Sequence, residues 1–542
     1  MSNLFVIHGD LARIHAHGYV IPTSGSLRPG SRWLPVLLDP TQEPRWETAL
    51  RAPAARVRPG FDGAGERLLL ATDIASGSED IAHLTGGLEA ALAEAAAQFE
   101  RFTWTDPRDH QDTLRRDRPL LAMPLVGSGR GGFRHAQGRV VREVLRTLDR
   151  RLPELPFDVV LVCWTRAQYA AVQSTRRSAG LAQPELSGAL AAAIPELAKR
   201  AARGSLGVLF GAGVSMPLGL PSWTELLAIL AEGHDLGALQ DLDPVDAASL
   251  IVSRLEPEVF AQRLGEHVTI ARHSLAHGLL ASLRPAVGVT TNYDRGYELA
   301  LAHVVGGSTP PMLPWTWPDR PGVPRVLKLH GDVELGSVVL SREHFVEMHA
   351  LRRPLTALLE EQMLANHVLA VGTSMSDATL VNAIAESAAL LASVRPRGTE
   401  RKVLGTVLMT MAHKARASLL SGSLDVLAAN QPPAEGAEPL GVLAAARVTD
   451  MFLDALAMNA ALELSYLADP AFDDLVVDPR LGEVAVLARS LRAAVDGAGV
   501  QGDLSWQPLL EALDGVGATA RPRPPEFGRR RSIPTIRSSD AR

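Results

Sequence analysis

Four short polar segments contain residue types that could hold a ligand and transfer a proton. Their chemically interesting residues are Gly211, Ala212, Gly213 and Ser215 in GAGVS (211–215), Asn292 and Asp294 in VTTNYDRGYE (289–298), His330 in VLKLHGD (326–332), and Gly372, Thr373, Ser374 and Asp377 in VGTSMSDATL (371–380). A carboxamide can orient a water molecule or a hydroxyl group, and an imidazole can accept a proton at neutral pH. The residue types therefore indicate a site that positions a nucleophile and moves a proton.

Each of these segments directly follows a short apolar run that predicts a β-strand, at residues 206–210, 287–291, 325–329 and 368–371. Taken singly, each segment has a simpler explanation: Asn292 as a turn residue, His330 as a core histidine, and residues 372–374 as a strand-to-helix turn with Asp377 near the helix cap. Open α/β sheets, however, bind ligands beyond the carboxyl ends of their strands, and glycines there let backbone N–H groups approach phosphate oxygens. Four such polar turns, each at a strand end and following one another in this order along the chain, predict a shared nucleotide site.

This ordered set resembles the NAD-binding signature of the sirtuin family over residues 205–410, and VVLSREHFVEM (338–348) is similar to the bacterial sirtuin-like branch. The resemblance implies a Rossmann-type fold, with Ala212, Gly213 and Ser215 at the pyrophosphate and ribose. It implies that Asn292 and Asp294 lie near the nicotinamide riboside, and Ser374 near the adenosine. It also implies that His330 is the base acting on a ribose hydroxyl, and that Gly211, Gly372, Thr373 and Asp377 belong to the NAD-binding set.

The chain contains a single cysteine, Cys163. One cysteine excludes an intrachain disulfide and the four-cysteine zinc module that protein deacylases of the sirtuin family carry. We therefore expect no metal and, without an acyl acceptor, water as the nucleophile, so that NAD+ is hydrolysed to nicotinamide and ADP-ribose. This expectation matches the zinc-free sirtuin-like proteins of bacterial anti-phage systems, which deplete NAD+ on infection and also carry a helical insertion like that expected at residues 223–283.

Residues 1–180 predict a separate α/β domain, with strands at 4–7, 19–21, 67–71, 120–124 and 159–164 and helices at 78–102 and 136–151. Its segments IHGDL (7–11), GYVIPTS (18–24) and PLVGSGRGGF (124–133) resemble those of the macro domain, a three-layer α/β module that binds ADP-ribose. The resemblance implies a ligand site made by Asp10, Leu11, Ser24, Gly127, Ser128, Gly129, Gly131, Gly132 and Phe133. Ser24 replaces the family's ribose-contacting asparagine, so we expect binding rather than hydrolysis of ADP-ribosyl bonds. A generic nucleotide-binding α/β domain is the alternative.

The length of 542 residues predicts about three domains. We expect a macro-like domain at 1–180, a sirtuin-like catalytic domain at 185–427, a helical C-terminal region at 440–520 and a basic disordered tail at 521–542. The net charge of −6 gives no drive toward nucleic acid, and no apolar run reaches the roughly 18 residues of a membrane span. With no signal-peptide pattern at the N-terminus, we expect a cytoplasmic protein. Only four of the 54 basic residues are lysines, at positions 199, 328, 402 and 414.

Three functional hypotheses follow from these features. The first is an NAD+ hydrolase that a signal switches on, through an ADP-ribose-type nucleotide bound to the N-terminal domain or through a change of homo-oligomer. The second is an enzyme that transfers ADP-ribose from NAD+ to a protein, where the macro-like domain recognises the attached ADP-ribose. The third is a binding module that only senses NAD+ or ADP-ribose.

Overall fold

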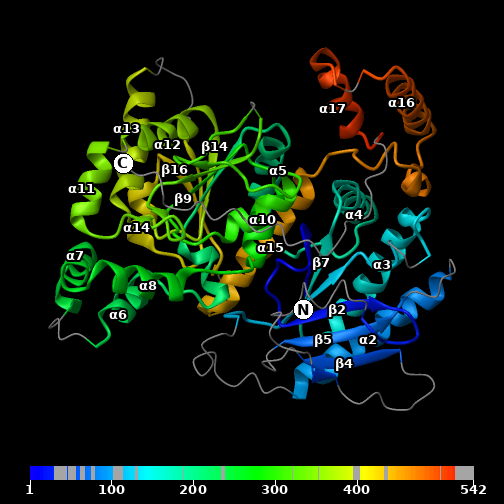
Figure 1. Cartoon of the computed structure of the whole chain (residues 1–542), viewed down its shortest axis with the longest axis horizontal. Helices are drawn as coiled ribbons and strands as arrows, with labels where there is room; N and C mark the ends of the chain where they lie inside the picture. The colour runs from blue at the N-terminus through cyan, green and yellow to red at the C-terminus, as the bar shows by residue number, and fades with distance from the viewer. Residues whose placement is uncertain are drawn as a thin grey trace. The chain divides into compact units, whose positions relative to one another are not determined.

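The computed structural model describes residues 1–29, 45–46, 56–61, 67–74, 80–101, 114–128, 132–186, 188–233, 239–319, 322–351, 353–394, 403–431, 438–500 and 502–518. The chain forms two compact units, and each has its own seven-stranded sheet (Figure 1). The first unit contains Met1–Asp109, Arg118–Glu185 and Asp454–Arg531, and the second contains His110–Asp117, Leu186–Leu453 and Ser532–Arg542. The predicted limits of the domains stay predictions.

The sheet of the first unit has the order β1-β7-β6-β2-β5-β4-β3. Its strands are β1 (Leu4–His8), β2 (Gly18–Thr23), β3 (Arg45–Trp46), β4 (Val57–Phe61), β5 (Leu68–Asp73), β6 (Leu120–Pro124) and β7 (Asp158–Cys163). The five strands from β1 to β5 in this order run parallel, and β4 and β3 are added antiparallel at the β5 edge. The parallel strands therefore end at one shared edge, where ligands bind in open α/β sheets.

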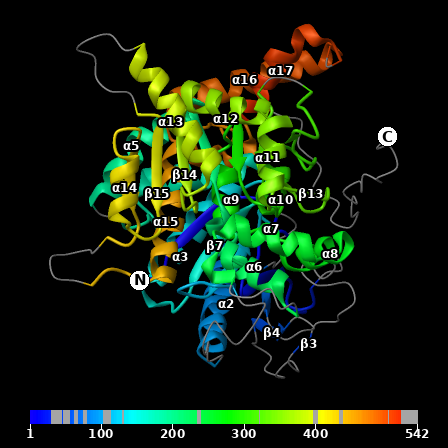
Figure 2. The same cartoon turned by 90° about the vertical axis from the view of Figure 1, so that its left-hand side faces the viewer.

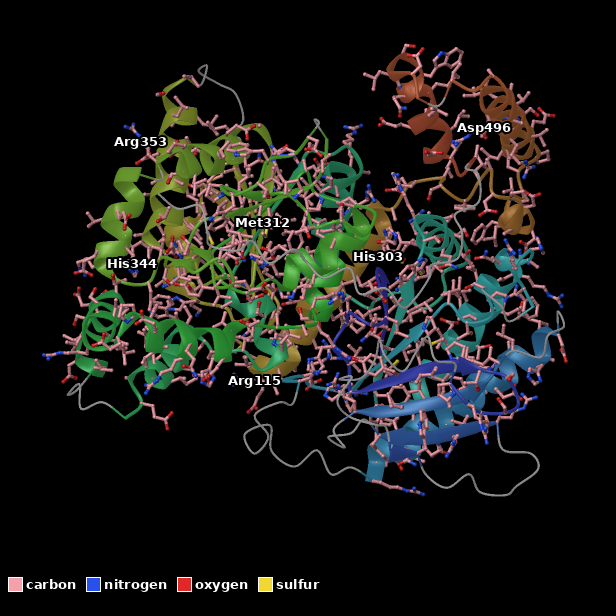
Figure 3. The ribbon with its side chains drawn as sticks, viewed as in Figure 1. Arg115, His303, Met312, His344, Arg353 and Asp496 are labelled. Carbon is pink, nitrogen blue, oxygen red and sulfur yellow. The ribbon has the colours of Figure 1, made fainter. Side chains whose placement is uncertain are left out.

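Three helices pack on one face of this sheet: α2 (Ile81–Arg101), α3 (Gln137–Arg151) and α4 (Arg166–Ala179). Alternate strand residues such as Leu4, Val6, Leu68 and Leu70 point to this face, because successive side chains of a strand lie on opposite sides. The unit also includes the end of α15 (Val442–Ala460), then α16 (Pro479–Gly497) and α17 (Gln507–Gly515). An ion pair from Arg492 to Asp496 lies on α16, where Asp496 is labelled in Figure 3.

The second unit contains a parallel sheet with the order β10-β11-β9-β8-β14-β15-β16. Its strands are β8 (Leu206–Phe210), β9 (Val287–Thr290), β10 (Met312–Leu313), β11 (Arg325–Lys328), β14 (His367–Val371), β15 (Gly405–Met409) and β16 (Leu424–Ala428). A separate two-stranded hairpin joins β12 (Gly331–Asp332) to β13 (Ser337–Val338). The order reverses between β8 and β14, as in a doubly wound nucleotide-binding fold. Met312, on the edge strand β10, is labelled in Figure 3.

Helices cover both faces of the second sheet (Figure 2). Leu209 and its neighbours on one face pack with α12 (Arg353–Ala365) and α13 (Ala378–Ser393), whereas Phe210, on the other face, contacts His277 of α9 (Leu275–Ser282) and Tyr297 of α10 (Gly296–Val304). The insertion between β8 and β9 also contains α6 (Trp223–Ala231), α7 (Pro244–Arg254) and α8 (Pro257–Val268), which form a small core of their own. The remaining helices are α5 (Gly188–Ala202), α11 (Arg342–Leu351) and α14 (Lys414–Leu420).

The structure contains five strands that the sequence did not predict: β3, β4, β10, β12 and β16. Strand β4 contains Pro59 and Gly60, which disfavour a strand, and it is tolerated because it pairs antiparallel beside the edge strand β3. Apolar runs in the sequence also predict strands at 338–340 and 403–410. The first is the two-residue β13, which begins one residue earlier at Ser337, and the second is β15. Among the described residues, none of the helices is long and apolar enough to cross a membrane.

Candidate functional site

Two glycine turns meet where the strand order of the second sheet reverses. The N–H of Gly213, after β8, donates to the carbonyl oxygen of Gly372, after β14, over 2.8 Å. A Cβ atom on Gly213 would lie 2.7 Å from that oxygen, and Gly372 has a φ of +62°, in the left-handed region that favours glycine. Glycine is therefore required at both positions, and the turns form the kind of close-approach backbone that can face a phosphate.

Ser215 is the centre of a buried hydrogen-bond network beside these turns. Its hydroxyl donates to Oδ2 of Asp294 over 2.9 Å, and it accepts from Nδ2 of Asn292 over 3.0 Å. The second amide hydrogen of Asn292 is directed to the carbonyl oxygen of Gly211, 3.2 Å away. Because both contacts of the amide are donated by Nδ2, its oxygen Oδ1 is the atom that Asn292 can offer to a substrate, and a carbonyl oxygen can only accept.

His277, which the sequence did not single out, is the fourth member of this network. The backbone N–H of Ser274 donates to Nδ1 of His277 over 3.2 Å, which places the ring proton on Nε2, and Nε2 lies 3.3 Å from the hydroxyl of Ser215. Burial lowers the pKa of His277 to about 4, so the ring is neutral at neutral pH. In the sequence, Ser274 signals the start of helix α9, which it caps. It gives no indication that His277 contacts Ser215.

His330 lies beyond β11, buried beside a carboxylate and an aromatic ring. Its Nε2 is 3.3 Å from Oδ2 of Asp377, and its ring packs edge-on against Phe345 with the centroids 5.3 Å apart. The other oxygen of Asp377 accepts from the N–H of Leu380 over 3.0 Å and so caps α13. Asp377 therefore has two functions in the structure, a helix cap and a neighbour of the predicted base.

Thr373 and Ser374 form hydrogen bonds within their own turn, and Ser374 is also bonded to a residue of α14. Thr373 accepts from the N–H of Met375, Ser374 shares a hydrogen bond with Ser376, and the carbonyl of Ser374 accepts from Arg416 of α14. Ser374 is exposed and Ala212 is also exposed, so both are accessible at this edge. The structure thus brings the predicted residues of the second unit to one edge of its sheet, while their roles in binding NAD+ stay predictions.

The predicted ligand residues of the first unit also follow strand ends, at β1, β2 and β6. Asp10 accepts from the N–H of Ala12 in a tight turn, and Ser24 is exposed next to β2. Leu11 and Phe133 are buried in the core, and Ser128 donates to the carbonyl of Leu125.

Two described glycines of the loop after β6 have left-handed backbones, with φ of +79° at Gly127 and +101° at Gly132. Gly129 and Gly131 lie outside the described residues. The loop is thus partly described, and its proposed contact with a ligand stays a prediction.

A family model described as SIR2-like domain matches residues 287–409 of this chain. The matched range runs from β9 to β15 and includes Asn292, Asp294, His330 and the turn after β14, whereas the turn after β8 precedes it. Part of the second unit is therefore similar to a SIR2-like domain.

Three curated relatives are each called NAD(+) hydrolase ThsA. The chain is 28% identical over 194 residues to the protein from Acinetobacter baumannii (strain 532279), 26% over 195 residues to that from Cytobacillus dafuensis, and 27% over 198 residues to that from Bacillus cereus (strain MSX-D12). Each match covers 34% of this chain and 39–40% of the relative, so the chain spans about two fifths of the length of the curated relatives it matches. A solved structure described under the mechanism and regulation of Sir2 enzymes is 16% identical and covers 48% of this chain and 96% of its own, with a TM-score of 0.27, too low to establish a shared fold.

Proposed function

We propose that the second unit hydrolyses NAD+ to nicotinamide and ADP-ribose. The SIR2-like match and the similarity to three proteins named NAD(+) hydrolase ThsA support this activity. The observation that carries the proposal is the fixed orientation of the Asn292 amide, which leaves its oxygen as an acceptor at the ligand edge of the sheet.

Cleavage of the bond between nicotinamide and ribose creates positive charge at the sugar carbon, as in glycoside hydrolysis. The amide oxygen of Asn292 can accept a hydrogen from the attacking water and so direct a lone pair of that water toward the sugar. His330 can accept a proton from a ribose hydroxyl, and the carboxylate of Asp377 lies 3.3 Å from its Nε2 atom. The glycine turns at 211–213 and 372 would hold the diphosphate through backbone N–H groups.

The first experiment is to incubate the purified whole chain with NAD+ and follow nicotinamide and ADP-ribose. The wild-type chain releases both products in equal amounts, and Asn292→Ala or His330→Ala lowers the rate about 100-fold or more. Asn459→Ala is a matched control, because the amide of Asn459 donates to the carbonyl oxygen of Ala455 one turn earlier in α15. Absence of nicotinamide release by the wild-type chain, in buffer and in lysate of infected cells, would contradict the proposal.

The same assay separates hydrolysis from transfer. If ADP-ribose from labelled NAD+ appears on protein rather than in solution, the chain is an ADP-ribosyltransferase. If Asn292→Ala and His330→Ala leave the cellular phenotype intact, the chain is a sensor.

We also propose that the first unit binds an ADP-ribose-type nucleotide that regulates the hydrolase. The support is its parallel strand order, which gathers Asp10, Ser24 and the glycine turn at 127 on one edge, and the left-handed backbone of that turn. Titration of the whole chain with ADP-ribose tests the proposal. Asp10→Ala is expected to weaken binding at least tenfold, and equal binding by both proteins would contradict it.

A further inference from the structure

Lys328 is a fully buried lysine at the end of β11, two residues before His330. Its ammonium nitrogen lies 3.0 Å from a carboxylate oxygen of Glu298 on α10 and 3.0 Å from one of Asp332. Although burial by itself lowers the pKa of Lys328, the two carboxylates raise it above its ordinary value, so the side chain is charged.

The same ammonium holds the turn that follows β9. It donates to the carbonyl oxygen of Asp294 over 2.7 Å and lies 3.4 Å from that of Tyr293. The ammonium group thus donates to the carbonyl oxygen of Asp294 and forms ion pairs with Glu298 and Asp332. Lys328 therefore connects the backbone of the Asn292–Asp294 turn to the strand that carries His330.

Arg295 makes a second connection between the same two segments. Its Nε and Nη2 atoms contact the carboxylate of Asp332 at 2.8–3.0 Å, and its Nη1 atom contacts Glu334 at 2.7 Å. Although burial alone would raise the pKa of Asp332, Arg295 and Lys328 hold it below its ordinary value. The carboxylate of Asp332 thus pairs with two cations, Arg295 from the turn after β9 and Lys328 from β11.

The geometry of Lys328 also accounts for the choice of lysine over arginine. The chain has only four lysines among 54 basic residues. The oxygens on Asp294, Glu298 and Asp332 come from three different segments, and the compact ammonium lies within 3.0 Å of all three. A guanidinium group is planar and larger, and its donors form a rigid fork.

We propose that Lys328 is a positioning residue for the reaction: its ammonium fixes the Asn292–Asp294 turn relative to His330, so that the acceptor oxygen and the base face the same sugar. The proposal rests on the proposed function, because it assigns Lys328 a part in NAD+ hydrolysis. Lys328 lies beneath the site and acts through the backbone of Asp294. A displacement of about 1 Å in a reacting group can lower a rate about 100-fold.

The test compares Lys328→Met/Glu298→Gln with Glu298→Gln in the whole chain. Removing Lys328 alone would leave the buried carboxylate of Glu298 without this cation and could prevent folding, so the double variant neutralises that carboxylate as well. Glu298→Gln is the matched control, because burial already raises the pKa of Glu298 and the ammonium contact to Asp294 remains. We expect kcat for nicotinamide release to fall at least tenfold in the double variant and by less than about threefold in the control.

Three further readouts separate positioning from loss of structure. The KM of the double variant for NAD+ stays within about threefold of that of the control, because Lys328 bonds to the turn after β9 and to carboxylates rather than to the phosphate turns. Amide hydrogen exchange at residues 291–296 becomes faster in the double variant than in Glu298→Gln. In an Asn292→Ala background, the Lys328 change adds less than about threefold, because it acts through the same turn.

The outcomes distinguish this proposal from the proposed function. A wild-type chain that releases no nicotinamide overturns the proposed function and the role of Lys328 with it. An active wild-type chain with a double variant as active as Glu298→Gln overturns only the role of Lys328. The same conclusion follows if kcat falls only in parallel with a rise in the KM for NAD+ and a loss of thermal stability.

Discussion

At the scale of single residues, the hydrogen-bond network around Ser215 has one consistent assignment of its protons. The hydroxyl donates to Asp294, so it accepts from Asn292 and from Nε2 of His277. His277 can donate there because its Nδ1 atom already accepts from the N–H of Ser274. With the ring proton on Nε2, the neutral ring acts as a donor to Ser215 in the resting protein.

This neutral state predicts how stability depends on pH. Burial lowers the pKa of His277 from 6.5 to about 4, so between these values the unfolded chain binds a proton that the folded chain does not. Stability from this residue is present above pH 6.5 and is lost as the pH falls toward 4. In urea denaturation at pH 7 and about 4.5, the free energy of unfolding should fall by about 2 to 3 kcal/mol more for the wild-type chain than for His277→Gln. Equal losses in the two proteins would show that His277 is not buried in its neutral form.

At the scale of elements, the candidate site depends on the close approach of the turns after β8 and β14. Gly213 and Gly372 are in backbone contact at the point where the strand order reverses. Other glycines lie in open surroundings: Gly265, inside α8, has no atom within 4 Å of the position of a Cβ. Replacing glycine by alanine at position 213 and, separately, at position 265 therefore allows a matched comparison.

Gly213→Ala is expected to destabilise the protein by about 1 to 3 kcal/mol, because its Cβ would overlap the backbone of Gly372. It should also lower NAD+ hydrolysis about tenfold or more, since the phosphate-facing turn must move. Gly265→Ala should instead stabilise by about 0.5 to 1 kcal/mol and leave the activity unchanged, because alanine is the better helix former. Thermal unfolding and the nicotinamide assay measure both effects, and similar results for the two variants would contradict the importance of the turn contact.

The sequence predicted elements well where their pattern is local. The limits of β6 and β8 agree with the predicted runs at 120–124 and 206–210, and the polar turns that follow strands were found from their residue types. It did not predict β16 at the sheet edge, whose residues do not alternate cleanly between buried and exposed. It also missed His277 and Lys328, because their partners are distant in the chain and a histidine in a helix or a lysine in a strand carries no motif.

At the scale of the whole molecule, the chain returns to its first unit after completing the second. Residues 454–531 group with residues 1–109 and 118–185, and Ala461, Tyr466, Ala471 and Phe472 belong to the same core as β1 and α2. Helix α15 is thus divided between the units, since its residues up to Leu453 group with the second. The folded first unit therefore requires a segment that follows the sheet of the second unit in the sequence.

An ion pair in the first unit makes this requirement testable. Asp454 and Arg176 are completely buried, with oxygen and nitrogen 2.8 Å apart. Asp454 also accepts from the N–H of Val6, and Arg176 donates to the carbonyl of Leu4, so the pair satisfies polar groups on the open edge of β1. A buried charge that loses its partner costs about 3 to 5 kcal/mol.

Asp454→Ala should therefore destabilise the first unit by about 3 to 5 kcal/mol and speed amide hydrogen exchange in β1. Arg176→Met/Asp454→Leu should recover part of this loss, because no unpaired charge remains, although the edge groups of Leu4 and Val6 stay unsatisfied. Exchange in β8 and β14 of the second unit is the internal reference and should change little. If β1 exchanges as slowly in Asp454→Ala as in the wild-type chain, the C-terminal segment does not hold the first unit together through this pair.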